Sequence, residues 1–183
     1  HVQSPVYGAS KWGAMGWIRA IAPQLATFDI QINGICPGLV DTPILDNLTG
    51  VESTEGGSGI QFKGVVTKAH GVRVKGKLDF PPTHPHLAHF KYLKSVTSRV
   101  PKMTIPSPSM LHYRGGREAI DKNAYASIDE YYADLGKTYA KAVKTFYDAG
   151  CRYLQLDDTS LSYFCDPEQR KMLESRGDDP ARL

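Results

Sequence analysis

The fold is decided by MTIPSPS at residues 103–109 and by ASIDEYYADLGKTYAKAVKTFYDAGCRYLQLDD at residues 126–158. Met103–Ile105 predicts a short strand that Pro106 closes, because proline lacks the backbone donor that a strand ladder needs. Residues 153–156, Tyr-Leu-Gln-Leu, predict a second strand. The segment between the two strands therefore decides how they are connected.

A helix is expected over residues 128–149. Ser127 and Glu130 have the spacing of a capping box, and Gly150 suits the left-handed conformation that often follows a helix. Apolar residues recur along one face at the helical period, namely Ile128, Tyr132, Leu135, Tyr139, Ala142, Phe146 and Ala149. Strand, helix and strand make a β-α-β unit with a right-handed crossover. Because ligands bind beyond the carboxyl ends of such strands, the Ser107–Arg117 loop and Asp157–Asp158 are expected to face each other over one site.

The N-terminal part predicts a helix followed by a strand. Apolar residues at helical spacing predict a helix from Ser10 to about Ala26, which should end or bend near Pro23 because proline removes a backbone donor. Ile30–Cys36 predicts a strand that Pro37 stops. Helix and strand in close succession indicate an α/β pattern.

The middle of the chain predicts a linker and a hairpin. Residues 46–59 contain glycines and polar residues that are typical of a loop. Ile60–Lys68 and Val72–Phe80 are two runs of strand-like composition, and Ala69–Gly71 between them suits a turn. The expected domain boundary follows from this change of character, with a first part over residues 1–46 and a second over 47–183.

The composition limits the class of function. The 183 residues carry a net charge of +3, and no run of Lys and Arg indicates nucleic acid or an acidic membrane surface as a partner. The three cysteines are Cys36, Cys151 and Cys165, without C-x-x-C spacing, so free thiols in a reducing cytoplasm are expected. No apolar stretch approaches the ~18 residues of a membrane span. The chain starts at His1 without an initiator methionine, which favours a piece of something longer.

Tyr7 and Lys11 form the first chemical motif. Residues four apart share one helix face, and a lysine ammonium beside a phenol lowers the phenol pKa from its usual value of ~10. This pair suits general acid–base chemistry beside a nicotinamide, although ordinary surface helices carry the same spacing by chance.

Residues 1–45 resemble the short-chain dehydrogenase/reductase family. The resemblance rests on Ser4–Lys11 (SPVYGASK), Ile30–Asn33 (IQIN) and Pro37–Pro43 (PGLVDTP). It implies that Tyr7 is the proton donor, that Lys11 orients the nicotinamide ribose of NAD(P), and that Thr42 contacts the carboxamide. The family's Gly-rich turn, where backbone donors meet the pyrophosphate, has no match here. The family's catalytic serine is expected about a dozen residues before Tyr7, and only six residues precede Tyr7 here.

Asp157 and Asp158 form the second motif. Two carboxylates at a strand end suit general acid–base chemistry, metal binding or a substrate amine, and the alternative is a capping aspartate beside a solvated one. Thr104–Gly116, Asp148–Asp158 and Cys165–Glu168 together resemble the cobalamin-independent methionine synthase family, in particular its single-barrel relatives. This resemblance covers residues 48–183.

The resemblance implies a TIM-type barrel that transfers a methyl group from a methylated folate to homocysteine on zinc. It places Asp157, with Asp158 beside it, on the homocysteine amino group. Weaker expectations, from position in the loop, place Ser107 and Ser109 on the substrate carboxylate and give a basic rim for an anionic tail. The rim residues are His112, Arg114 and Arg117.

No metal ligand is assigned. The family's zinc ligands, a His-x-Cys strand end with further Glu and Cys residues, have no match between Asp158 and Leu183. His84, His86 and His89 have ligand-like spacing, but Pro85 and the polar surroundings favour an exposed loop.

The predicted fold class is therefore α/β, with a partial TIM-type barrel after a helix–strand piece of a Rossmann-like fold. Three functions stay open: a methyltransferase-like protein that binds an amino acid and a folate, an NAD(P)-dependent oxidoreductase fragment, or a recombined or truncated product without a complete site. A barrel needs eight strands, so open strand edges should favour self-association.

Overall fold

The computed structural model describes residues 5–32, 45, 47–58, 68–158 and 160–181. Side chains at 5–8, 10, 55–58, 68–70 and 162 lie outside that description. The chain divides into two compact units, His1–Thr42 and Pro43–Leu183, a few residues before the boundary expected from the sequence. Among the described residues, no helix is long and apolar enough to cross a membrane.

Unit 1 contains helix α1, Pro5–Ala26. The helix begins earlier than expected, and proline suits a first helical turn because its missing N–H has no intrahelical acceptor there. It continues through Pro23 and ends at Ala26. Residues 30–32, the described part of the expected strand, belong to no strand, so that prediction is wrong there, and residues 33–36 lie outside the described range.

A long hairpin opens unit 2. Strand β1, Thr49–Ser58, pairs antiparallel with β2, Lys68–Asp79, in a register that places Val51 opposite Val74. The prediction of a loop over residues 46–59 is therefore wrong from Thr49 to Ser58, and the prediction of a turn at Ala69–Gly71 is wrong as well. Of the strand predicted over Ile60–Lys68, all but Lys68 lies outside the described residues. Polar residues can form β1 because backbone hydrogen bonds to β2 hold the strand along its length. Apolar side chains are needed only at positions that other parts of the protein cover. Val72–Phe80 was correctly predicted as a strand except for its last residue.

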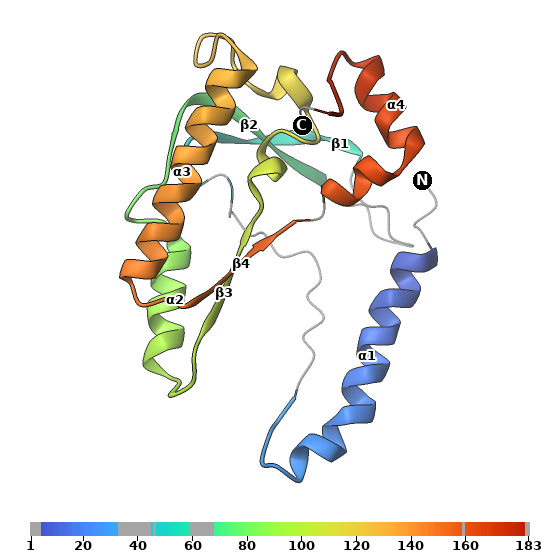
Figure 1. Ribbon diagram of the computed structural model, residues 1–183, viewed down its shortest axis with the longest axis vertical. Coiled ribbons are helices and arrows are strands. Elements are labelled where there is room, and N and C mark those ends of the chain that lie inside the picture. The colour runs from blue at the N-terminus through green and yellow to red at the C-terminus, as the bar shows by residue number, and fades with distance from the viewer. Residues whose placement is uncertain (1–4, 33–44, 46, 59–67, 159, 182–183) are drawn as a thin grey trace. The chain divides into compact units, whose positions relative to one another are not determined.

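The predicted β-α-β unit is confirmed. Strands β3, Lys102–Pro106, and β4, Tyr153–Asp157, pair in parallel with Ile105 opposite Leu156. Helix α3, Ile128–Asp148, joins them. Figure 1 shows the two strands beside each other at the centre of unit 2.

Both ends of α3 are formed as the sequence predicts. Ser127 caps the start, accepting a bond from the Glu130 backbone N–H at 3.1 Å. Gly150 has φ +96°. The N–H of Cys151 bonds Phe146 O and that of Gly150 bonds Tyr147 O, both at 2.9 Å, which is the bonding of a Schellman motif.

Helix α3 packs on helix α2, Pro85–Ser95, and on both sheets. Phe146 is fully buried and its ring centroid lies 5.9 Å from that of Phe80 and 6.3 Å from that of Phe90. The Tyr139 hydroxyl donates to Pro106 O at 3.0 Å. Burying such aromatic surface is the main favourable term in this core.

The observed class is mixed α/β. The described residues form two sheets of two strands each, β1–β2 and β3–β4, and no closed barrel. The loop after β3 contains short 3-10 turns, Pro108–Leu111 and Gly116–Ala119, and a third spans Leu161–Cys165 before helix α4, Pro167–Ser175.

Candidate functional site

The carboxyl ends of β3 and β4 bring two predicted segments together. The Ser107 backbone N–H donates to Asp157 O at 2.9 Å, directly beyond the last register pair, Pro106 with Asp157. The loop after β3 and the strand end of β4 are thus neighbours, as the topology of a β-α-β unit requires.

The two strand-end aspartates differ in role. Asp158 Oδ1 accepts the backbone N–H groups of Ser160 and Leu161 at 2.8 and 3.2 Å, so this carboxylate holds the turn that follows β4. Asp157 is exposed, and no described residue bonds its carboxylate. Asp157 is therefore the carboxylate that is available to a ligand.

A row of three serine hydroxyls connects the loop to this turn. Ser107 Oγ lies 2.9 Å from Ser109 Oγ, which lies 2.7 Å from Ser160 Oγ. Ser160 Oγ in turn donates to Asp158 Oδ1 at 3.3 Å. Ser107 and Ser160 are buried, whereas Ser109 is half-buried. Sequence reasoning missed Ser160, because it lies 51 residues from Ser109.

The three residues of the expected basic rim have different surroundings. His112 is only 4% exposed, and its Nδ1 lies 3.2 Å from the Tyr131 hydroxyl. Burial lowers the pKa of His112 to about 4, so this ring is neutral at pH 7. His112 is therefore a buried, neutral ring covered by α3 and not a charged group, while its place in a rim that meets an anionic tail stays a prediction.

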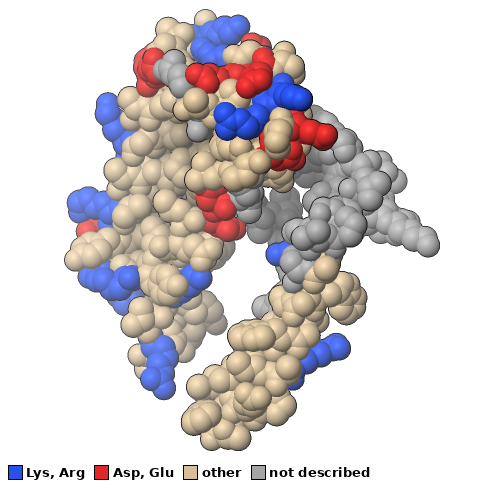
Figure 2. All heavy atoms as spheres, turned by 45° about the vertical axis from the view of Figure 1, so that its right-hand side comes forward, with Lys and Arg blue, Asp and Glu red and all other residues tan. Residues whose placement is uncertain are grey.

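The two arginines of that expected rim also have different surroundings. The Arg117 guanidinium donates to Ile120 O and Tyr125 O at 2.8 and 2.7 Å, and this contact supports the loop. Arg114 is exposed. On the face that Figure 2 shows, basic and acidic side chains are interspersed over unit 2, so this face carries no continuous basic patch.

The C-terminal segment is seated on the same loop. Arg176 donates to Tyr113 O and Arg114 O at 2.7 and 2.9 Å and forms an ion pair with Asp178. A pocket of about 590 Å³ lies here. Its lining comprises His112, Gly116, Arg117, Ile128, Tyr132, Gly177, Asp178 and Asp179.

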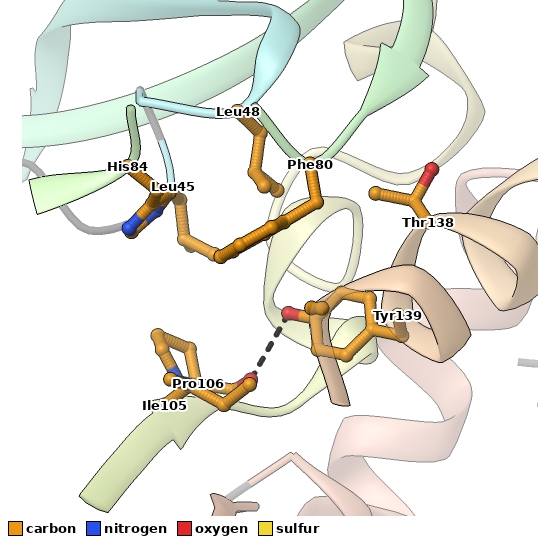
Figure 3. Close-up of a pocket in the computed structure, with 9 residues that line it drawn as sticks. Leu45, Leu48, Phe80, His84, Ile105, Pro106, Thr138 and Tyr139 are labelled. Atoms are coloured by element: carbon orange, nitrogen blue, oxygen red, sulfur yellow. Dashed lines mark hydrogen bonds between the residues drawn. The ribbon is translucent and has the colours of Figure 1, made fainter. Parts of the chain in front are cut away.

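A smaller pocket lies beside the end of β3. It has an empty volume of about 310 Å³, and Figure 3 shows His84, Phe80 and Tyr139 around it. The remaining lining residues are Leu45, Leu48, Ile105, Pro106, Thr138 and Ala142. Its walls are mostly apolar, and the space that a water-sized group can reach inside it is only about 20 Å³.

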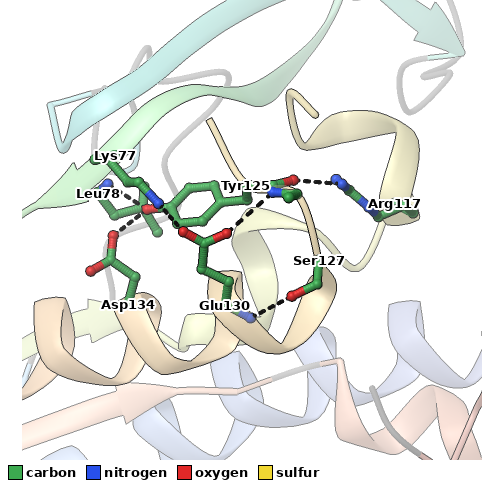
Figure 4. Close-up of polar contacts among 8 residues, drawn as sticks. Lys77, Leu78, Arg117, Tyr125, Ser127, Glu130 and Asp134 are labelled. Atoms are coloured by element: carbon green, nitrogen blue, oxygen red, sulfur yellow. Dashed lines mark hydrogen bonds and ion pairs between the residues drawn. The ribbon is translucent and has the colours of Figure 1, made fainter. Parts of the chain in front are cut away.

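Tyr125 anchors the loop before α3 to β2. It is fully buried; its hydroxyl accepts the Leu78 N–H at 2.7 Å and donates to Asp134. Burial, followed by the Asp134 bond, raises the pKa of Tyr125. Figure 4 shows this contact beside the Lys77–Glu130 ion pair, whose hydrogen bond lowers the pKa of Glu130. This network was not predicted, because nothing in the local pattern around Tyr125 identifies its distant partners.

The residues of the oxidoreductase interpretation lie in unit 1. Lys11 is exposed on α1. Tyr7 is in the same helix, but its side chain lies outside the described part. Thr42 also lies outside the described residues. The structure therefore places the backbones of Tyr7 and Lys11 one helical turn apart.

No group of three His, Cys, Asp or Glu side chains among the described residues is arranged to hold a metal ion. His84 and His86 stack at the start of α2 with ring centroids 5.2 Å apart, and His89 meets His86 edge to face at 5.6 Å. Burial, together with both neighbouring histidines, lowers the pKa of His86. His84 is buried rather than in an exposed loop, so that expectation is wrong. The described residues do not fit the zinc that the methionine synthase resemblance implies.

Comparisons with known proteins find two different sets of relatives for this chain. A family model described as short chain dehydrogenase matches residues 1–52. The 15-hydroxyprostaglandin dehydrogenase (NAD(+)) of Bos taurus is 42% identical over 66 residues, which is 35% of this chain and 24% of that protein.

The larger part of the chain is similar to other proteins. The uncharacterized protein YxjH of Bacillus subtilis is 46% identical over 140 residues, or 76% of this chain and 36% of YxjH. A crystal structure from Listeria monocytogenes, named as a candidate vitamin-B12 independent methionine synthase, is 44% identical with a TM-score of 0.52. It matches 67% of this chain and 33% of its own. The chain spans about a third of the length of these relatives.

Proposed function

We propose that unit 2 is methyltransferase-like and binds homocysteine, with the ammonium group of the amino acid on the Asp157 carboxylate. The observation that carries this proposal is the position of Asp157, exposed at the end of β4 and joined through its carbonyl to Ser107 at 2.9 Å. Similarity to the Listeria monocytogenes structure named for methionine synthesis supports the substrate class.

Methyl transfer by this chain alone is not expected. A thiol with a pKa near ~8.5 is mostly protonated at neutral pH and is a poor nucleophile, and the family's zinc overcomes this by holding the thiolate. Because the described residues do not fit a metal ion, the proposed activity is binding of the amino acid without turnover of a methylated folate.

A binding experiment tests the proposal. We expect L-homocysteine to bind the full chain with a Kd of about 1 mM, and Asp157→Asn to weaken binding at least about tenfold by removing the charged acceptor. Isothermal titration calorimetry gives both values. Glu118→Gln removes an exposed carboxylate elsewhere and should leave the Kd unchanged. Equal binding by wild type and Asp157→Asn would contradict the proposal.

Turnover is tested separately. Wild type with zinc, homocysteine and methylated folate should form no methionine above a protein-free control. Methionine that forms with wild type but not with Asp157→Asn would show that a complete catalytic site exists.

The second candidate function is a nicotinamide-dependent oxidoreductase fragment. The match of residues 1–52 to the short chain dehydrogenase model supports it, with Tyr7 as proton donor and Lys11 beside it. We expect no tight NAD(P) binding, because no Gly-rich phosphate-binding turn is recognised in the sequence. Titration with NADH and NADPH, followed by cofactor fluorescence, tests this expectation, and saturation at micromolar concentration would favour the oxidoreductase.

A further inference from the structure

The direction of the serine hydroxyl row follows from its last member. Ser160 Oγ has two acceptors outside the row, Asp158 Oδ1 at 3.3 Å and the Met110 sulfur at 3.7 Å. Neither carries a proton, so both contacts direct the proton of Ser160 out of the row, and the charged carboxylate is the stronger acceptor. The reverse arrangement would leave two oxygens facing each other with lone pairs only. A hydrogen bond to a carboxylate is also stronger than one between neutral hydroxyls.

Each hydroxyl has one proton, so the direction passes along the row. With the Ser160 proton directed to Asp158, the 2.7 Å contact between Ser109 and Ser160 uses the proton of Ser109. The 2.9 Å contact between Ser107 and Ser109 then uses the proton of Ser107. Hydrogen bonds in a row polarise one another in the same direction, which favours this arrangement further.

Burial decides which member a ligand meets. Ser160 and Ser107 are 0% and 2% exposed, so neither is offered to a ligand. Ser109 is half-buried. Its oxygen accepts from Ser107 and its proton is donated to Ser160, which leaves one lone pair for a ligand and no free O–H.

We infer that Ser109 presents a hydrogen-bond acceptor, so that the strand-end site binds an ammonium group and does not bind a carboxylate through its serines. This changes the expectation that Ser107 and Ser109 meet the substrate carboxylate. Asp158 and Ser160 are positioning residues, because they act on the ligand through the proton of Ser109. The inference rests on the proposed function for the place of the site.

Thiol-free probes test the inference without homocysteine. Butylamine and butanoate have the same number of carbons and carry only the ammonium or only the carboxylate. In amide NMR spectra of the full chain, we expect saturable shifts at residues 107–109 and 157–161 with butylamine. Butanoate should bind there at least about tenfold more weakly, a difference of about 1.4 kcal/mol.

Serine variants separate Ser109 from the charge of Asp157. Ser109→Ala removes the acceptor and should weaken butylamine binding about three- to tenfold. Ser160→Ala removes the group that receives the Ser109 proton, which frees that hydroxyl to donate, so the preference for butylamine over butanoate should fall several-fold. A purely structural role for Ser160 would weaken both probes alike. Ser95→Ala, an exposed serine on α2, is the control, and the unfolding midpoint of each variant monitors the fold.

The outcomes are distinct. Preferential butanoate binding, no saturable shift with either probe, or an unchanged preference in Ser160→Ala would each overturn the inference, even if homocysteine binds. Preferential butylamine binding that Ser160→Ala relaxes, with no homocysteine binding, would support the inference and remove the proposed substrate.

Discussion

At the residue scale, burial determines which polar groups can act on a ligand. His112 and Ser107 are both at most 4% exposed, whereas Asp157 and Arg114 are exposed in the same region. A buried polar group must find partners inside the protein, and His112 does so with Tyr131. The pattern of the loop gave no sign of this, because α3 supplies the partner.

The burial of His112 predicts a pH dependence of stability. An unfolded histidine titrates near ~6.5, whereas burial lowers the pKa of folded His112 to about 4, opposed by Asp178 and reinforced by Arg176. Between these values only the unfolded chain binds the proton. The contribution to stability is therefore complete above about pH 6.5 and is lost as the pH falls toward about 4, by about 3 kcal/mol.

Urea unfolding at several pH values between about 7.5 and 4.5 measures this effect. In His112→Gln the loss of stability over that range should be smaller than in wild type by roughly 2 to 3 kcal/mol. Parallel curves for the two proteins would mean that the pKa of His112 is the same in the folded and unfolded states.

At the element scale, residues that act within one helical turn allowed the ends of a helix to be predicted. The capping serine Ser127 and the left-handed Gly150 act within one helical turn, so α3 and its ends could be predicted from the sequence. Strand β1 could not, because its polar residues are held by pairing with β2. The hydrogen bonds of Ser160 and Tyr125 could not be predicted for the same reason, since their partners lie on other elements.

Replacement of glycine by alanine should have opposite effects on stability at two positions. Gly116 has φ +58°, and a Cβ there would lie 2.5 Å from Asp178 Oδ2 and 3.0 Å from Arg176 Nε. Gly116→Ala should therefore displace the C-terminal segment and lower the free energy of unfolding by about 1 to 3 kcal/mol. Gly136 lies within α3 with open space around it, so Gly136→Ala should raise stability by about 0.5 to 1 kcal/mol.

Thermal and urea unfolding of the two variants gives the comparison. Equal destabilisation by both substitutions would contradict the position of Gly136 within a helix and with open space around it. A neutral Gly116→Ala would show that the Arg176–Asp178 pair does not occupy the space beside Gly116.

At the scale of the whole molecule, the chain forms two compact units and has two sets of relatives. The β-α-β unit of the larger part was predicted from its own residues, whereas the barrel that its resemblance implies stays a proposal. The described residues contain one pair of parallel strands, β3 and β4. Closure of a barrel depends on strand pairing between distant segments, which no local pattern in this chain specifies.

The open strands predict self-association. Within the described residues, β3 and β4 each pair with one strand only, so each has a row of backbone N–H and C=O groups that a second copy can pair with. Tyr153 and Leu156 on β4 are 55% and 45% exposed, which adds apolar surface to that contact. We expect sedimentation velocity to show a fraction of dimer or larger species that rises with protein concentration.

A charge placed on β4 should oppose this association, because lysine on an edge strand disfavours pairing with another strand. Leu156→Lys should weaken association by about tenfold, a difference of about 1.4 kcal/mol. Val143→Lys on α3, at a similarly exposed position (44%), is the matched control and should leave it unchanged. If both variants weaken association equally, the contact depends on general surface charge. If wild type sediments as a monomer at every concentration, other contacts already cover the strand edges.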